Sequence, residues 1–120
     1  GGEVSRIMLS IKSILSSYIK LSTIIFDEID TGISGSVSSK VADLMGQMSK
    51  NMQVIVITHT PQVASKGDFH YKVFKKEVEN KIITDIKLLE DKDRVKEIAE
   101  MLSGDKSNKS ANELANELLN

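Results

Sequence analysis

The chain has 120 residues, 40% of them hydrophobic and 28% charged, which is the composition of an ordinary globular domain and not of a disordered segment. Its 16 basic and 17 acidic side chains nearly cancel, so the overall charge gives no sign of binding to nucleic acid or to an anionic membrane. The lack of cysteine excludes disulfides and thiolate metal sites, and the absence of a signal peptide or of an apolar run of roughly 20 residues predicts a cytoplasmic protein without a membrane partner.

The first third of the chain predicts a helix, a strand and a loop. Apolar residues at spacings of three and four between Val4 and Tyr18 form one stripe of a helix, which begins directly after residues 1–3. Residues 22–27 form a short β-branched strand, and the glycines and serines of residues 30–36 indicate a loop.

A second helix and strand follow this loop. Ser34 or Ser36 is placed to cap a helix that begins at Val37 and ends near residues 49–51. Residues 54–57 are a continuous β-branched run, which is typical of a strand buried on both faces in a parallel sheet. The order strand, helix, strand therefore predicts a right-handed crossover between two parallel strands.

The second half of the chain predicts a hairpin and two helices. Apolar and polar residues alternate in residues 69–76 and 82–89, on either side of a turn. This pattern indicates an antiparallel hairpin with one solvent-exposed face at a sheet edge. A helix is expected after Asp91 and is stopped by Ser103 and Gly104, and residues 104–109 form a polar linker. The last helix is expected to start at Ser110, where Glu113 completes a capping box.

Polar side chains follow both predicted parallel strands. Asp27 and Glu28 end the first strand, and His59 comes directly after the second. Because the carboxyl ends of parallel strands meet at one edge of a sheet, these side chains are expected to converge there. Two carboxylates at such a place can divide the work of holding a metal and polarising a water, although a solvated acidic turn and a structural histidine explain the same residues.

Gly1 and Gly2 precede the first predicted helix. Free backbone N–H groups and a partial positive charge at a helix N-terminus can hold an anion, and glycine allows its close approach. Two leading glycines are equally consistent with the remnant of an expression tag.

The order of these features resembles one family. A Gly-Gly-Glu segment opening a helix, an apolar strand ending in Asp-Glu, an Asp-x-Gly loop and a β-branched strand ending in His are together similar to the C-terminal lobe of an ABC-type ATPase head. Residues 1–6, 25–35 and 57–64 resemble, more narrowly, RecN, the bacterial SMC-like DNA repair ATPases. Residues 31–35 and 61–64 favour RecN over other SMC-like heads.

The resemblance covers essentially the whole chain and implies its fold class. It implies an α/β lobe with parallel strands, a crossover helix, an edge antiparallel hairpin and C-terminal helices. Residues 1–103 would be the lobe, and residues 104–120 a linker and the C-terminal helix of the same domain.

The resemblance also implies roles for individual residues. Asp27 matches the Walker B aspartate, which holds Mg²⁺ usually through a water, and Glu28 matches the general base that activates the attacking water. His59 matches the switch histidine that senses the γ-phosphate. The implied nucleotide-binding residues are Gly1, Gly2 and Glu3 of a signature motif whose usual preceding serine is absent here, and Asp30 of the D-loop.

The implied cofactors are the ATP and Mg²⁺ of a complete head. The chain has no Gly-x-x-x-x-Gly-Lys-Ser/Thr segment, so it is expected to bind ATP weakly and to hydrolyse essentially none by itself. The expected partners are an N-terminal lobe of the same protein carrying the P-loop, a second head in a homodimer, and DNA at the bacterial nucleoid. The resemblance thus implies an ATPase that acts in the repair and recombination of DNA double-strand breaks.

Alternative interpretations stay open. The lobe is either part of an ATPase or a non-catalytic interaction and dimerisation module, and a different SMC-like head is a third possibility. Two catalytic carboxylates disfavour a pure scaffold. A candidate DNA-binding patch lies around the hairpin, although mixed charges on an edge hairpin more often serve solubility; it consists of Lys72, Lys75, Lys76 and Lys81.

Overall fold

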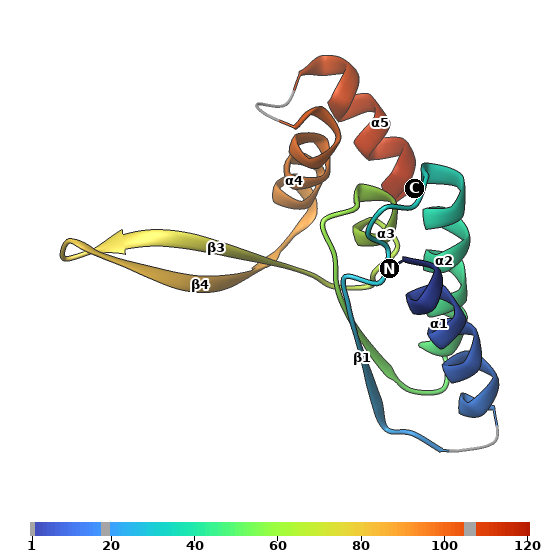
Figure 1. The fold of residues 1–120 in the computed structure, drawn as a ribbon. Helices are drawn as coiled ribbons and strands as arrows, with labels where there is room; N and C mark the ends of the chain where they lie inside the picture. The colour runs from blue at the N-terminus through green and yellow to red at the C-terminus, as the bar shows by residue number, and fades with distance from the viewer. Residues whose placement is uncertain (1, 18–19, 105–107) are drawn as a thin grey trace. The chain divides into compact units, whose positions relative to one another are not determined.

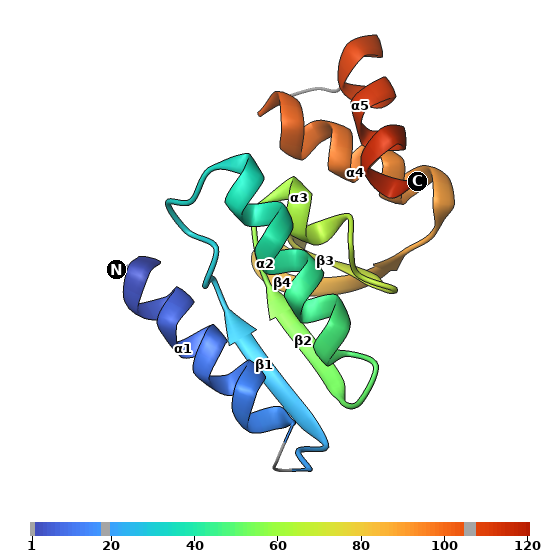
Figure 2. The ribbon, with the colours of Figure 1, turned by 90° about the vertical axis from the view of Figure 1, so that its right-hand side faces the viewer.

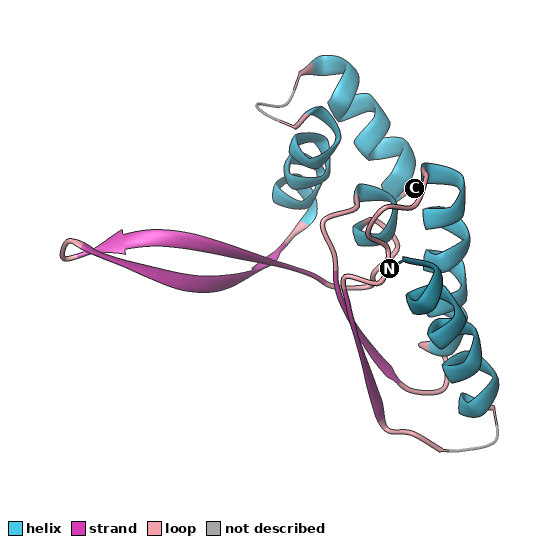
Figure 3. Cartoon of the chain, in the orientation of Figure 1, coloured by secondary structure: helices cyan, strands magenta, loops and turns pink. Residues whose placement is uncertain are grey.

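A computed structural model describes residues 2–17, 20–104 and 108–120 of the chain. The chain forms two compact units, Gly1–Lys66 and Gly67–Asn120 (Figure 1). Helices and strands alternate in the first unit, whereas the second unit consists of a hairpin followed by two helices (Figure 3). The predicted α/β fold class is confirmed.

The first unit contains a pair of parallel strands and three helices. Its elements are α1 (Gly2–Ser16), β1 (Thr23–Asp27), α2 (Gly35–Met48), β2 (Gln53–Ile57) and α3 (Pro61–Ala64). The ladder between β1 and β2 is parallel and runs from the pair Thr23↔Gln53 to the pair Asp27↔Ile57. The predicted parallel arrangement and its connecting helix α2 are thus confirmed.

One face of this small sheet is covered by helices. Ile24 and Phe26 of β1 are buried in one cluster with Leu9 of α1. Figures 1 and 2 show α1 and α2 on the same side of β1 and β2. The buried side of α2 contributes Val41, Ala42, Met45 and Met48 to the same cluster. Successive side chains of a strand alternate between the two faces, so this packing fixes which residues of β1 point away from the helices.

The other face of the sheet is exposed, which corrects the expectation that residues 54–57 are buried on both sides. Ile25 is 58% exposed, and its partner across the ladder, Ile55, is 42% exposed. Ile57, at the end of β2, is 50% exposed. The reason is that the described helices of the first unit pack on one side of the strand pair. The β-branched run therefore forms a strand with one buried face and one exposed face.

The predicted apolar stripe of α1 is largely exposed as well. Val4, Ile7, Ile11 and Ile14 are accessible to solvent, whereas Leu9, on another side of the helix, enters the core. Tyr18, which was expected to extend the stripe, lies outside the described residues.

The second unit begins with the predicted hairpin. Strands β3 (His70–Val78) and β4 (Lys81–Leu89) pair antiparallel and form a two-stranded sheet of their own. Glu79 and Asn80 connect them with φ angles of 49° and 61°. Two successive positive φ angles are the mark of a tight turn that matches the twist of the strands.

The hairpin is followed by helices α4 (Asp91–Ser103) and α5 (Lys109–Leu119), which pack on each other. Ile98 and Ala99 of α4 and Ala115 of α5 are fully buried. Gly104 ends α4 with a φ of 71°, as predicted for its position.

The predicted start of α5 at Ser110 is wrong. Asn108 is the N-cap residue, and its Oδ1 accepts a hydrogen bond of 2.8 Å from the backbone N–H of Ala111. Asn and Ser are about equally good N-cap residues, so the residue type alone does not indicate which of the two begins the helix. Ser110 is already inside the helix.

Candidate functional site

The predicted polar residues gather where β1 and β2 end. The backbone N–H of Glu28 donates a 2.8 Å hydrogen bond to the carbonyl of Ile57, which extends the ladder by one residue beyond Asp27. Asp27 and Glu28 therefore leave the sheet at the same edge as the segment that carries His59. All three side chains are exposed, so a bound molecule can reach them.

The backbone changes direction sharply at Glu28. Its φ is 50°, in the left-handed region that a residue with a side chain adopts only at a cost. The carbonyl of Glu28 accepts a 2.9 Å hydrogen bond from the hydroxyl of Thr31, which closes the turn. Gly32, with a φ of 75°, carries the chain onward toward α2. The glutamate thus stands at a strained turn, which is common among functional residues.

Asp30 is buried inside this turn and is only 2% exposed. One of its carboxylate oxygens, Oδ2, accepts a hydrogen bond from the hydroxyl of Thr58. The other, Oδ1, is buried and has no hydrogen-bond partner among the residues that the structure describes. A buried carboxylate is costly unless it is well paired, so the bond from Thr58 is the contact that holds this group.

The loop after β2 is tied down on both sides of His59. The Thr58 hydroxyl accepts a 2.9 Å hydrogen bond from the backbone N–H of Thr60. The Thr60 carbonyl in turn accepts bonds from the N–H groups of Val63 and Ala64 at the start of α3. Pro61 is the first residue of α3, where its missing N–H costs nothing. The sequence did not single out Thr58, and a hydroxyl residue directly before the histidine was the available signal.

The first turn of α1 lies at the same end of the fold as the carboxyl ends of the strands (Figures 1 and 2). Gly2 is the first residue of α1, Glu3 is exposed in its first turn, and Gly1 lies outside the described residues. Within ranges 2–17, 20–104 and 108–120, no hydrogen bond or ion pair joins Glu3 to the residues at the strand ends. Ser34 occupies the N-cap of α2 without a capping side-chain bond.

No group of three or more His, Cys, Asp and Glu side chains in the described part of the chain is arranged to hold a metal ion. Mg²⁺ commonly takes one or two carboxylates and completes its shell with water and substrate phosphates. An exposed carboxylate pair at a strand end, such as Asp27 and Glu28, fits that donor set.

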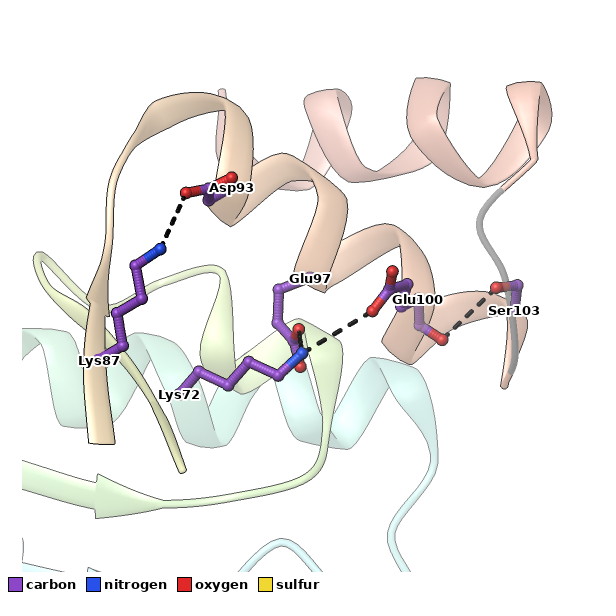
Figure 4. Close-up of polar contacts among 6 residues, drawn as sticks. All are labelled: Lys72, Lys87, Asp93, Glu97, Glu100 and Ser103. Atoms are coloured by element: carbon purple, nitrogen blue, oxygen red, sulfur yellow. Dashed lines mark hydrogen bonds and ion pairs between the residues drawn. The ribbon is translucent and has the colours of Figure 1, made fainter. Parts of the chain in front are cut away.

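Two of the four lysines of the predicted basic patch form ion pairs within the second unit. Lys72 of β3 pairs with Glu97 and, at 3.8 Å, with Glu100 of α4 (Figure 4). Lys76 pairs with Asp85 across the hairpin. This pairing fits the interpretation of the hairpin charges as a solvated, self-neutralised surface.

Three side chains of the second unit have shifted pKa values. The hydrogen bond to Glu97 raises the pKa of Lys72 above its ordinary 10.5, and the hydrogen bond from Lys76 lowers the pKa of Asp85 below its ordinary 3.8. Burial lowers the pKa of His70 below 6.5, and the nearby Arg94 guanidinium lowers it further. These groups belong to the hairpin and α4, not to the strand ends of the first unit.

Comparison with curated proteins relates the chain to one family. Two DNA repair proteins RecN, from Halalkalibacterium halodurans and Rickettsia conorii, are 43% and 45% identical to it over 119 residues, or 99% of this chain. RecN from Bacillus subtilis is 44% identical over 104 residues. This chain is homologous to one segment of RecN. It spans 21% and 22% of the length of the first two relatives, about a fifth of each.

A solved structure has a fold similar to that of this chain. A chain from work on the structural biochemistry of ATP-driven dimerization and DNA-stimulated activation of SMC ATPases aligns with a TM-score of 0.59. The alignment covers 75% of the present chain and 53% of the SMC chain, at 23% identity. No family model matches the sequence. In the described residues, no helix is long and apolar enough to cross a membrane.

Proposed function

We propose that the chain is the C-terminal lobe of the ATPase head of a RecN-type DNA repair protein. The observation that carries the proposal is that Asp27, Glu28 and the His59 loop leave two parallel strands at one edge, in a segment with 43–45% identity to RecN. In this proposal residues 1–103 form the lobe, and residues 104–120 add a linker and helix to the same domain.

Each residue at the edge has a proposed task in ATP hydrolysis. The exposed Glu28 carboxylate accepts a proton from the water that attacks the γ-phosphate, and the His59 side chain contacts that phosphate. Asp27 would hold Mg²⁺, and the ion would supply positive charge to offset that of the phosphates. The segment of Gly1, Gly2 and Glu3 and the loop that carries Asp30 would meet a nucleotide held by the opposite head.

The exposed face of the small sheet supports a partner lobe. Ile25, Ile55 and Ile57 lie on that face and are each at least 42% exposed, which is unusual for isoleucine side chains. We propose that a P-loop lobe of the same protein covers this face and supplies the phosphate cradle. Burial of a fully exposed isoleucine stabilises such an interface by about 1.5–3 kcal/mol, and these partly exposed side chains would each contribute part of that.

The proposed assembly is a homodimer of two heads that acts on DNA in the bacterial cytoplasm, at the nucleoid. The relatives are named DNA repair proteins, and the SMC neighbour is described by ATP-driven dimerization and stimulation by DNA. With Lys72 and Lys76 paired to carboxylates, the hairpin patch is not proposed as the DNA contact.

Steady-state ATP hydrolysis by the full-length RecN-type protein tests the proposal. Glu28→Gln is expected to reduce kcat by about 100-fold or more while ATP still binds, because the general base is lost. Glu79→Gln is a matched control, since Glu79 is also exposed and has nearly the same φ, 49° against 50°. The 120-residue chain alone is expected to be inactive. Turnover by the chain alone, or an unimpaired Glu28→Gln variant, contradicts the assignment.

A further inference from the structure

Asp30 and Thr58 form a contact that the proposed hydrolytic chemistry does not use directly. Asp30 follows Glu28 by two residues, and Thr58 precedes His59 by one. Their side chains are hydrogen-bonded although they stand 28 residues apart in the sequence. The contact therefore joins the segment that carries the proposed base to the segment that carries the proposed phosphate sensor.

The Thr58 hydroxyl is fixed in direction by two hydrogen bonds. It donates its only proton to Asp30 Oδ2 and accepts the backbone N–H of Thr60 at 2.9 Å. His59 lies between Thr58, which carries this hydroxyl, and Thr60, whose backbone N–H donates to it. Rotation of the hydroxyl would break one bond or the other, so the position of the His59 backbone depends on where Asp30 lies.

Asp30 is in turn fixed relative to Glu28. The Thr31 hydroxyl donates to the Glu28 carbonyl at 2.9 Å, and the Ile33 N–H donates to the Asp30 carbonyl at 3.4 Å. With an exposure of only 2%, the Asp30 carboxylate is shielded from solvent, so the solvent does not replace Thr58 as its partner. Loss of the Thr58 hydroxyl would leave both carboxylate oxygens buried without a partner, and the loop would move to hydrate them.

We propose that the Asp30–Thr58 hydrogen bond is a positioning contact that sets the place of His59 relative to Glu28 for hydrolysis. This inference rests on the proposed ATPase function. Asp30 acts within its own chain here, so its carboxylate has a task separate from any contact across a head dimer. Misplacement of a reacting group by about 1 Å can cost 100-fold in rate, so the contact is expected to affect kcat more than ATP binding.

The test compares variants of the full-length protein in steady-state ATP hydrolysis. Thr58→Val keeps the shape of the side chain and removes the hydroxyl, and we expect kcat to fall about 10- to 100-fold with the KM for ATP changed less than about 2-fold. Thr58→Ser restores the hydroxyl and is expected to recover most of the lost rate. Thr23→Val is the matched control, because the Thr23 hydroxyl also bonds across β1 and β2, to Gln53 at 3.2 Å, but at the opposite end of the strands.

A double-mutant cycle with His59→Ala separates positioning from general damage to the fold. If Thr58 acts through His59, adding Thr58→Val to His59→Ala changes kcat by less than about 2-fold, whereas independent effects would multiply. The inference is overturned if Thr58→Val hydrolyses ATP normally, if Thr58→Ser is as slow as Thr58→Val, or if the two effects multiply. Glu28→Gln is measured in parallel: an inactive wild type, or an active Glu28→Gln variant, overturns the proposed function and this inference with it.

Discussion

Replacement of Glu28 by glycine is expected to leave the first unit more stable than replacement by alanine does, although both changes remove the proposed base. Glu28 has a φ of 50°, and a left-handed backbone costs a residue with a side chain about 1–2 kcal/mol. Glycine adopts this conformation freely but loses more chain entropy on folding, by about 0.4–1 kcal/mol. The difference predicts that Glu28→Gly is more stable than Glu28→Ala by about 0.5–1 kcal/mol, since both variants lack the carboxylate.

Amide hydrogen exchange of the 120-residue chain measures this difference within one unit. The amides of β1 and β2 are expected to exchange about 2- to 5-fold more slowly in Glu28→Gly than in Glu28→Ala, as 0.5–1 kcal/mol requires. Glu79→Gly and Glu79→Ala provide the same comparison in the hairpin turn, where φ is 49° and no function is proposed. Equal or faster exchange in Glu28→Gly would refute the reasoning that the turn at Glu28 is strained.

Three further predictions concern the cap of α5, the uncovered sheet face and the half-buried His70. Asn108→Ala is expected to lower the free energy of unfolding by about 1 kcal/mol and Ser110→Ala by much less, in denaturant titrations, because only Asn108 caps the helix. Replacing Ile55 and Ile57 by serine is expected to reduce self-association of the isolated chain in sedimentation experiments, and unchanged association would exclude this face as its cause. Because folding lowers the pKa of His70, the unfolded chain binds a proton at a higher pH than the folded chain does. The contribution of His70 to the free energy of unfolding is therefore complete above pH 6.5 and decreases as the pH falls below that value. In His70→Gln, the urea midpoint of unfolding should depend less on pH between pH 5 and 7.

The helical and strand patterns that follow one another along the sequence were enough to predict the helices and strands and their order. The predicted strands at residues 22–27 and 54–57 are found as β1 and β2, and the predicted loop after the first strand separates β1 from α2. The pattern of residues 54–57 does not indicate how many faces of the strand are buried, because that depends on how many layers pack on the sheet. Exposure of Ile55 and Ile57 was therefore missed.

The predicted convergence of Glu28 and His59 followed from strand direction alone and is confirmed at the level of the backbone ladder. The burial of Asp30 was not predictable in the same way. An Asp-x-Gly segment is typical of a solvated turn, and its partner Thr58 is 28 residues away in the sequence. Only the three-dimensional pairing of β1 with β2 brings the two side chains together.

Paired strands of this chain lie close together in the sequence, which affects how the chain folds. The parallel pair joins residues 30 positions apart, as in Thr23 and Gln53, and the antiparallel pair closes through Glu79 and Asn80. The entropy of loop closure grows only slowly with loop length, and mixed α/β domains fold at rates between those of helical bundles and those of all-β domains, which fold within about a second or less. A ribosome adds about 5–20 residues per second, so each unit has time to fold as soon as its last strand or helix has emerged. The β1–α2–β2 segment, with the loops that carry Glu28 and His59, can therefore form before the hairpin has been synthesised.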